Sequence, residues 1–569
     1  MSENDSFDEL LTTIGFGPWQ AIIVLTTVMI GCQLPVQIVG ATLLSGPMDF
    51  HCSHEPSTED SDLKYRDIGN GTYFNNTCLY AENSNVGDDI PNSQVKGMNG
   101  SLTGLTSCPY IEYDTSIYSS TVISQWHLVC EQENLVPLFQ MMYNIGGLFG
   151  CTLGGHIGDR FGRKRAIIIG SIFNMIAVVF MAFVPLYSVV LAMRLLVGCT
   201  DNLMLIPAWS LVLECTPSRH RSIVGMLLGL PYSTGAIIFG GISYMIRDWQ
   251  YLLLICSSPI LLILPLALYI DESPSWLIQQ GRAEEATQAL NKAANRNKAK
   301  LSTPVSSRVK ELVEDAASSN AMSTQTTKSS SAFGDNLREV KRYLTSPAMR
   351  IILLTTPVLW FTQACVYLSV VINANNFTST DPFLYMVLTG VMDASAILLS
   401  TPLATHFGRK VLIFGGMFIG AILFLLDLFI RVDYYWAKWI LVMAGFLLVG
   451  AAFQLNYVYS PELFPTSART RGFAFLNVIG QVGFTCAPLV TNFLAKYTWW
   501  AAGTFFGCAG ILASLMIPFL PETRNKALPE TLQDVEDRRN NSKKRKKVVE
   551  INEIKNAAIN EGFSTEERV

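Results

Sequence analysis

The segment Gly-Asp-Arg-Phe-Gly-Arg-Lys at residues 158–164 joins two apolar stretches, 135–157 and 166–186. Four of its seven residues are charged, and an altered copy, Thr-His-Phe-Gly-Arg-Lys, occupies residues 405–410, again between apolar stretches. Short charged connections between long apolar runs are typical of chains that cross a bilayer repeatedly, because charges are costly inside the hydrocarbon. The two copies therefore predict a membrane protein in which one arrangement of helices occurs twice.

The composition agrees with a chain that lies mostly in lipid. Of 569 residues, 50% are hydrophobic and only 15% are charged, whereas a soluble protein carries about 25% charged residues. Helices are the form in which apolar runs of about 20 residues satisfy their own backbone in lipid. We predict an all-α membrane protein with twelve transmembrane helices, at 18–44, 135–157, 166–186, 189–213, 223–246, 251–270, 350–372, 383–404, 411–430, 437–459, 472–494 and 498–520.

Further repeated pairs extend the duplication beyond the opening segment. Phe161–Lys164 recurs at 407–410, Glu214 recurs as Glu462, and an Arg follows each glutamate by seven residues, at Arg221 and Arg469. The offsets are 246 and 248 residues, which indicates two homologous six-helix halves, 18–270 and 350–520. Parallel repeats of this kind are the build of major facilitator transporters.

The loop at 45–134 predicts how the chain is oriented. It holds four cysteines, which suggest two disulfides with three possible connectivities, and three glycosylation sequons. The interval 41–134 contains 13 acids against three basic residues, whereas the short loops on the opposite side are basic, which places that side in the cytoplasm. We expect an extracellular loop, with the cytoplasmic segments 1–17, 271–349 and 521–569. The cysteines are Cys52, Cys78, Cys108 and Cys130, and the sequon asparagines are Asn70, Asn75 and Asn99.

The first apolar run is too long for a signal-peptide core and follows an acidic start, so we interpret it as the first spanning helix.

The repeated charged segment is interpreted as a cytoplasmic gate. Asp159 is expected to lie against the positive end of another helix, and Arg163 is expected to pair with Glu214. The predicted gating residues are Asp159, Arg160, Arg163, Glu214, Arg221, Glu462 and Arg469. In the second copy of the segment, His406 occupies the position of Arg160. This substitution weakens the predicted gating role of the second copy.

Several further motifs resemble the organic ion transporter family of solute carriers, within the major facilitator superfamily. They are STVISQWHLVC at 120–130, GDRFGRK, RLLVG at 194–198, DESPSWL at 271–277 and PELFPTSARTRG at 461–472. The resemblance runs from about residue 7 to 522. It implies a plasma-membrane transporter for organic cations, organic anions or zwitterions such as carnitine. The large loop with cysteines between the first two helices is itself a trait of that family.

Charged residues inside the apolar runs are the natural candidates for substrate recognition, because such charges are usually functional or paired. Asp393 matches a carboxylate of the family and is expected to meet either a cationic substrate or an Arg across the cleft. Arg194 belongs to a superfamily motif and is interpreted as structural. Asp201 is either a substrate or proton site or a local hydrogen-bond partner, and Asp427 is expected to pair at the surface with Arg431.

Alignment with the family on the eleventh helix places Gln481 where cation carriers have Asp and anion carriers have Arg. Ile397 replaces the Lys that anion carriers place after the acid of the eighth helix. Trp360 and Tyr367 match aromatic binding positions of the cation carriers, and aromatic faces bind organic ammonium ions at about 0.5–2 kcal/mol each. Tyr232 and Gln454 also match pocket positions. For the aromatic residues, helix packing or an interfacial belt is the alternative.

The resulting prediction is a carrier of organic cations or zwitterions that works by alternating access of a central cleft. The alternatives are an organic anion exchanger of the same family and a non-transporting surface receptor built on a transporter fold. The sequence shows no nucleotide-binding motif, metal-ligand cluster or nucleophile–base pair. An enzyme, a cofactor, a bound metal and a nucleic-acid partner are therefore not expected, and the lipid bilayer and a small organic ion are the expected partners.

Overall fold

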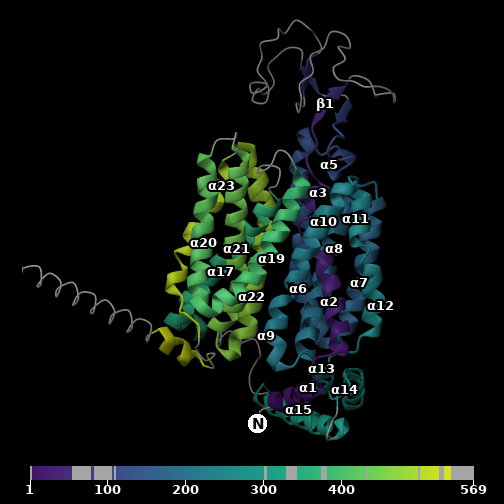
Figure 1. The fold of residues 1–569 in the computed structure, drawn as a ribbon, viewed down its shortest axis with the longest axis vertical. Helices are drawn as coiled ribbons and strands as arrows, with labels where there is room; N and C mark the ends of the chain where they lie inside the picture. Colours follow the sequence, from purple (N-terminus) through teal and green to yellow (C-terminus); the bar gives the residue numbers. More distant parts are fainter. Residues whose placement is uncertain are drawn as a thin grey trace, which may run out of the picture.

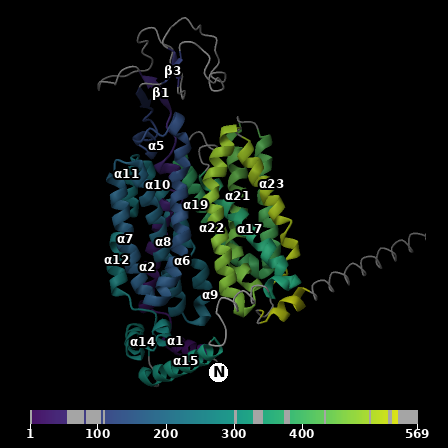
Figure 2. The same cartoon turned by 180° about the vertical axis from the view of Figure 1, so that it is seen from behind.

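A computed structural model describes residues 3–53, 79–81, 105–107, 110–299, 304–327, 342–372, 381–430, 434–497, 500–524, 529 and 531–539. Long helices dominate and form two bundles that stand side by side (Figures 1 and 2). The end of the molecule that carries the strands is called the loop end. The opposite end, which carries α1 and α13–α15, is called the tail end.

The N bundle contains the helices of the first half of the chain. They are α2 (Pro18–Ile38), α6 (Val136–Phe161), α7 (Arg163–Phe183), α8 (Tyr187–Cys215), α9 (Ser218–Leu227), α10 (Leu230–Met245), α11 (Trp249–Ser257) and α12 (Ile260–Tyr269). The pairs α9 with α10 and α11 with α12 each form one span, Ser218–Met245 and Trp249–Tyr269.

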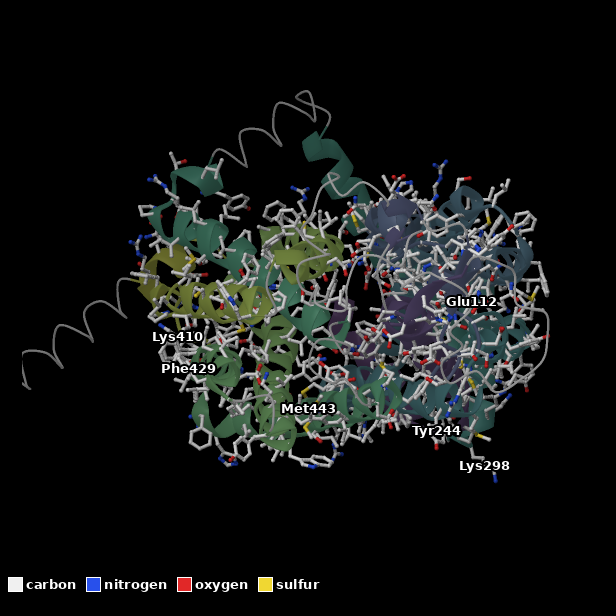
Figure 3. All side chains as sticks on the ribbon, turned by 90° about the horizontal axis from the view of Figure 1, so that it is seen from above. Glu112, Tyr244, Lys298, Lys410, Phe429 and Met443 are labelled. Atoms are coloured by element: carbon white, nitrogen blue, oxygen red, sulfur yellow. The ribbon has the colours of Figure 1, made fainter. Side chains whose placement is uncertain are left out.

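The C bundle repeats this arrangement. Its elements are α17 (Pro347–Ile372), α19 (Pro382–Phe407), α20 (Arg409–Leu426), η2 (Asp427–Phe429), α21 (Tyr435–Leu463), α22 (Thr466–Tyr497), α23 (Ala501–Ser514) and η3 (Ile517–Phe519). Seen from the loop end, Tyr244 lies on the side of the N bundle, whereas Phe429 and Met443 lie on the side of the C bundle (Figure 3).

Eleven spans among the described residues are long and apolar enough to cross a membrane. The remaining predicted span, 135–157, corresponds to α6, a 26-residue helix with six glycines that is not among these eleven. The predicted spans and the observed helices agree to within a few residues at most ends. The first run differs, because α2 ends at Ile38 and a separate short helix, α3 (Ala41–Leu44), follows.

The helix faces show why these sequences suit lipid. On α7, Phe173, Ile176, Phe180 and Phe183 are all at least 51% exposed, and their spacing places them on one face. Ser171 and Asn174 are buried on the other face. A soluble helix would have the reverse arrangement, so this large exposed apolar face identifies the outer surface of the bundle as the lipid-facing surface.

Elements outside the bundles cap both ends. Near the loop end lie β1 (Phe50–Ser53), β2 (Leu79–Ala81), β3 (Leu105–Ser107), β4 (Tyr110–Tyr113), α5 (Val122–Gln125) and η1 (Cys130–Leu135), with antiparallel β1–β4 and β2–β3 pairs. At the tail end lie α1 (Glu3–Ile14), α13 (Pro274–Gln279), α14 (Ala283–Asn297) and α15 (Val305–Thr327). The sequence predicted these regions only as polar segments.

Candidate functional site

The central polar group lies where the two bundles meet. Asp393 is in the middle of α19 and is 3% exposed. Its Oδ2 accepts a hydrogen bond from Ser233 Oγ of α10 at 2.6 Å, and its Oδ1 accepts one from Tyr367 OH of α17 at 3.0 Å. Ser233 belongs to the N bundle, whereas the other two residues belong to the C bundle. The sequence left open a substrate or an Arg as the partner of Asp393; the structure gives it two hydroxyl groups instead.

A small cavity adjoins this carboxylate. It measures about 10 Å³, and its lining includes Tyr232, Tyr367, Asp393 and Phe446. That volume holds about one water molecule. Three of the predicted substrate-binding residues therefore converge here, and the site is closed around them in this conformation.

The remaining predicted aromatic residue, Trp360, lies elsewhere in the C bundle. It is 1% exposed, its Nε1 donates to Ser460 Oγ at 2.8 Å, and its ring packs on Phe453 and Tyr457. Phe453 also contacts the ring of Tyr367, with centroids 5.4 Å apart. Trp360 thus reaches the carboxylate cluster through Phe453 in this conformation, and its contact with substrate stays a prediction. Gln454 is half-buried on α21, beside Asp393.

Gln481 lies at a second meeting point of the bundles. Its Nε2 donates to the backbone oxygen of Asn144 on α6 at 3.1 Å. In return, Asn144 Nδ2 donates to the backbone oxygen of Phe484 on α22 at 2.9 Å. The sequence did not single out Asn144. In this conformation Gln481 joins the halves of the molecule, and it lies outside the lining of the Asp393 cavity.

The buried charges of the N bundle are already engaged. Arg194 is fully buried and donates to Gln37 Oε1 at 2.8 Å, to Gln140 Oε1 at 3.3 Å and to two backbone oxygens. Asp201 accepts from Tyr143 OH at 3.1 Å and from Asn174 Nδ2 at 2.8 Å. These bonds match the structural interpretation of Arg194 and the local interpretation of Asp201.

Asp427 differs from its expected surface position. It lies in η2 and is 4% exposed. Its predicted partner, Arg431, lies outside the described residues.

Aromatic rings from both bundles contact one another near the loop end. Phe383, near the start of α19, packs on Tyr118 and on Tyr244, with centroid distances of 5.6 and 6.0 Å. The guanidinium of Arg247 lies 6.0 Å from the same ring. Phe383 is 6% exposed and Tyr118 is 4% exposed. These ring contacts therefore join the two bundles near the loop end, with the ring of Tyr244 more than half exposed.

The charged segments at 158–164 and 405–410 make equivalent contacts with a glutamate in the two halves, and each of these contacts is called a clasp. Glu272 accepts from the backbone N–H groups of Arg163 and Lys164 at 2.8 and 3.1 Å. Glu522 accepts from those of Arg409 and Lys410, both at 3.2 Å. Each carboxylate thus caps the N-terminus of a membrane helix, α7 or α20, where helix dipoles favour negative charge. The sequence pattern did not reveal this capping role of the two glutamates.

Ion pairs surround the first clasp. Arg163 contacts Glu214 at 3.0 Å, as predicted, and also Asp159 at 2.9 Å. Asp159 is 76% exposed and pairs within its own bundle, so in this conformation it does not have the predicted contact with another helix end. Arg160 is exposed and lies over the ring of Phe161.

The other predicted gating residues also bind locally. Arg221 pairs with Asp8 of α1 at 2.8 Å, a partner that the sequence did not indicate. Glu462 lies 3.7 Å from Arg409, a longer pair than its counterpart in the first half. Arg469 donates to the backbone oxygen of Pro529. These contacts leave the gating role of the residues a prediction.

Part of the predicted covalent chemistry falls outside the described residues. Cys130 forms a disulfide, and eight cysteines of the helices are free. Cys78, Cys108, Asn70, Asn75 and Asn99 lie outside the described residues, and the side chain of Cys52 is likewise not described. The pairing and the glycosylation therefore stay predictions. Within the described part of the chain, no cluster of His, Cys, Asp or Glu suited to a metal ion occurs.

Comparisons with known proteins agree with this architecture. Residues 93–534 match the family model described as sugar (and other) transporter. Solute carrier family 22 member 6-A of Xenopus laevis is 30% identical over 79% of this chain and 78% of its own. An organic cation transporter protein of Drosophila melanogaster is 27% identical over 93% and 94%. The xylose transporter of E. coli, in a partially occluded inward-open conformation, shares the fold with a TM-score of 0.57 at 18% identity, over 91% of this chain and 100% of its own.

Proposed function

Because the chain belongs to solute carrier family 22, within the wider family of sugar (and other) transporters, we propose that it carries small organic cations, or zwitterions such as carnitine, across the plasma membrane. The family and the fold are those of membrane transporters rather than enzymes. The finer proposal concerns which ions are carried and how.

The position of Asp393 is the observation that carries this proposal. A carboxylate at the meeting point of the two bundles, held by hydroxyl groups and beside the rings of Tyr232 and Tyr367, has the chemistry of a cation site. Neither hydroxyl neutralises its charge. A cationic substrate supplies that missing charge, which is favourable because a lone carboxylate in the membrane interior costs several kcal/mol.

Arg194 supports cations over anions. Its guanidinium has no exposed surface and already donates to two glutamine side chains and two backbone oxygens. Binding an organic anion there would require several of these bonds to break. The neutral side chains of Gln481 and Ile397, at positions where anion carriers of the family have cations, point in the same direction.

The proposed cycle uses the two bundles as the moving parts. We assign the loop end to the outside, because its loop is acidic and Cys130 is in a disulfide. The tail end, with both terminal segments, then faces the cytoplasm. The ring contacts of Phe383 are proposed to be the seal that closes the loop end to the outside in the described conformation. Transport requires this seal to open and the tail end to close in alternation.

Uptake by cells that express the chain tests the proposal. Radiolabelled 1-methyl-4-phenylpyridinium, carnitine and para-aminohippurate are compared at normal potential and in high potassium, which collapses the potential. We expect uptake of the cation that falls in high potassium, because a single positive charge gains about 2.3 kcal/mol per 100 mV. Uptake of the anion alone would refute the proposed specificity, and no uptake of any probe at normal surface expression would favour the receptor alternative.

A pair of variants links the cation to its proposed site. Asp393→Asn keeps the size of the side chain and removes its charge, and we expect cation uptake to fall about tenfold or more. Asp427→Asn is the matched control, because Asp427 is an equally buried carboxylate of the same bundle that lies outside the cavity lining. Equal losses in both variants, at equal surface expression, would remove Asp393 from the site.

A further inference from the structure

We infer that Ser233 holds Asp393 Oδ2 while the loop end is closed, and that the N–H group of a protonated amine takes its place there when the loop end opens. This inference rests on the proposed function. Ser233 was not among the residues predicted to bind substrate. It follows from which bundle each partner of Asp393 belongs to.

The two hydrogen bonds of Asp393 respond differently to opening. Tyr367 and Asp393 lie on α17 and α19 of the C bundle, so the bond to Oδ1 moves with that bundle. Ser233 lies on α10 of the N bundle, so the bond to Oδ2 spans the interface. Separation of the bundles at the loop end therefore removes the Ser233 donor of Oδ2 and leaves the Tyr367 donor of Oδ1, with Gln454 of α21 beside the carboxylate in the same bundle.

The backbones of α10 and α19 are close enough to make this bond short. A Cβ atom built on Gly390, one turn before Asp393, would lie 3.0 Å from the backbone oxygen of Ser233 and 2.8 Å from Cγ1 of Ile237. Such distances are shorter than ordinary contacts, so only glycine allows the two helices to approach this closely. Ser233 itself has no exposed surface, and its hydroxyl therefore has Asp393 as its fixed partner in the closed conformation.

The vacated oxygen selects the kind of cation. A carboxylate oxygen that loses its donor in a site of low polarity needs a replacement, because unsatisfied polar groups there are costly. A protonated primary, secondary or tertiary amine brings both a positive charge and an N–H group to Oδ2. A quaternary ammonium ion brings the charge alone and relies on the rings of Tyr367 and Phe446. The site is thus assigned a preference for a protonated amine over a quaternary ion of similar size; ions without an N–H, such as 1-methyl-4-phenylpyridinium and carnitine, bind there through their charge and the rings alone.

The first test measures the closed conformation without any substrate. Val371 lines the cavity and is 4% exposed, so Val371→Cys reports opening through its reaction with a membrane-impermeant methanethiosulfonate added outside the cell. We expect Ser233→Ala to raise the reaction rate about tenfold. Ser243→Ala is the matched control, because Ser243 is equally buried on the same helix but donates within that helix, to Gly240. Equal rates in the two variants would overturn the role of Ser233.

Ser233→Cys keeps the test decisive if Ser233→Ala does not reach the surface. A thiol is a weaker donor of similar size. The reaction rate of Val371→Cys should therefore lie between the rate in the protein with Ser233 and the rate expected for Ser233→Ala. A rate equal to that of the protein with Ser233 would count against the inference. This measurement needs no transported substrate. Its failure is therefore distinguishable from failure of the proposed function, which appears as absent cation uptake.

The second test addresses the class of substrate. Triethylammonium and methyltriethylammonium differ by one methyl group, which replaces the N–H. We expect triethylammonium to inhibit cation uptake at a concentration at least fivefold lower, and this preference should disappear in Asp393→Asn. Equal inhibition by the two ions in the unmodified protein would overturn the assignment to protonated amines.

Discussion

Replacement of Gly162 by alanine tests the contact of Glu272 with the start of α7. Gly162 connects α6 to α7 with φ +102° and ψ 154°, a conformation open essentially to glycine alone. A Cβ atom at this position would lie 2.2 Å from Glu272 Oε2 and 3.3 Å from the ring of Trp276. Gly162→Ala therefore both strains the backbone and displaces the carboxylate that caps α7.

Two contributions set the expected magnitude. The strained backbone costs about 1–3 kcal/mol. Displacing Glu272 weakens its charge-assisted bonds to the N–H groups of Arg163 and Lys164, which together stabilise the helix end by about 1.5–3 kcal/mol. The sum, roughly 2.5–6 kcal/mol, is a large part of the about 5–15 kcal/mol that holds a typical domain folded. We expect surface expression to fall severalfold and the thermal transition of the detergent-solubilised protein to drop by several degrees.

Gly155→Ala is the matched control for this experiment. Gly155 lies two turns earlier in α6, and a Cβ atom there meets no atom within 4 Å. Alanine at that position should leave expression unchanged, because alanine is the better helix former. Gly408→Ala, the equivalent change in the second half, should have an intermediate effect, since its Cβ atom would lie 2.9 Å from Glu522. Gly162→Ala protein as stable as the Gly155→Ala protein would refute the reasoning.

Three further outcomes follow from other contacts. Arg163→Ala should reduce uptake per surface molecule about tenfold and Arg409→Ala only about twofold, because the ion pairs of the first are 2.9 and 3.0 Å long and that of the second is 3.7 Å; equal losses would contradict this. Arg194→Lys should lower surface expression, as judged by surface biotinylation, because lysine lacks the planar set of donors that serves four acceptors. Gln481→Ala removes a bond to Asn144 of the other bundle and should change the loop-end accessibility of Val371→Cys without changing expression; an unchanged rate would count against it.

The sequence predicted the membrane helices well because their signal is physical and strong. Apolar runs, basic connections and the 246-residue repeat all act over long segments, and the helices begin and end within a few residues of most predictions. The repeat also pointed to the pairing of Arg163 with Glu214, which the structure contains at 3.0 Å. The helix α6 was predicted at 135–157 from its apolar run, although it contains six glycines.

The candidate site was harder to predict, because its key contacts join residues far apart in the chain. Ser233 is one of two serines on an apolar helix, and only the close crossing of α10 and α19 brings it to Asp393. The roles of Glu272 and Glu522 depend on backbone donors, which a sequence does not display. Asp159 was assigned a partner in another helix, but an arginine four residues away is the nearer partner in this conformation.

The position of α1 has a consequence for how the protein is made. Its Leu11 has no exposed surface and belongs to an apolar cluster with Val309 and Leu312 of α15, and its Glu9 pairs with Arg308, 299 residues further along. At about 5–20 residues per second, α1 emerges from the ribosome roughly 15–60 s before the helix that covers it. A chain released after residue 299 would contain all the N-bundle spans but lack the α15 part of the apolar cluster that contains Leu11. The contacts of α1 are therefore complete only when α15 has been translated.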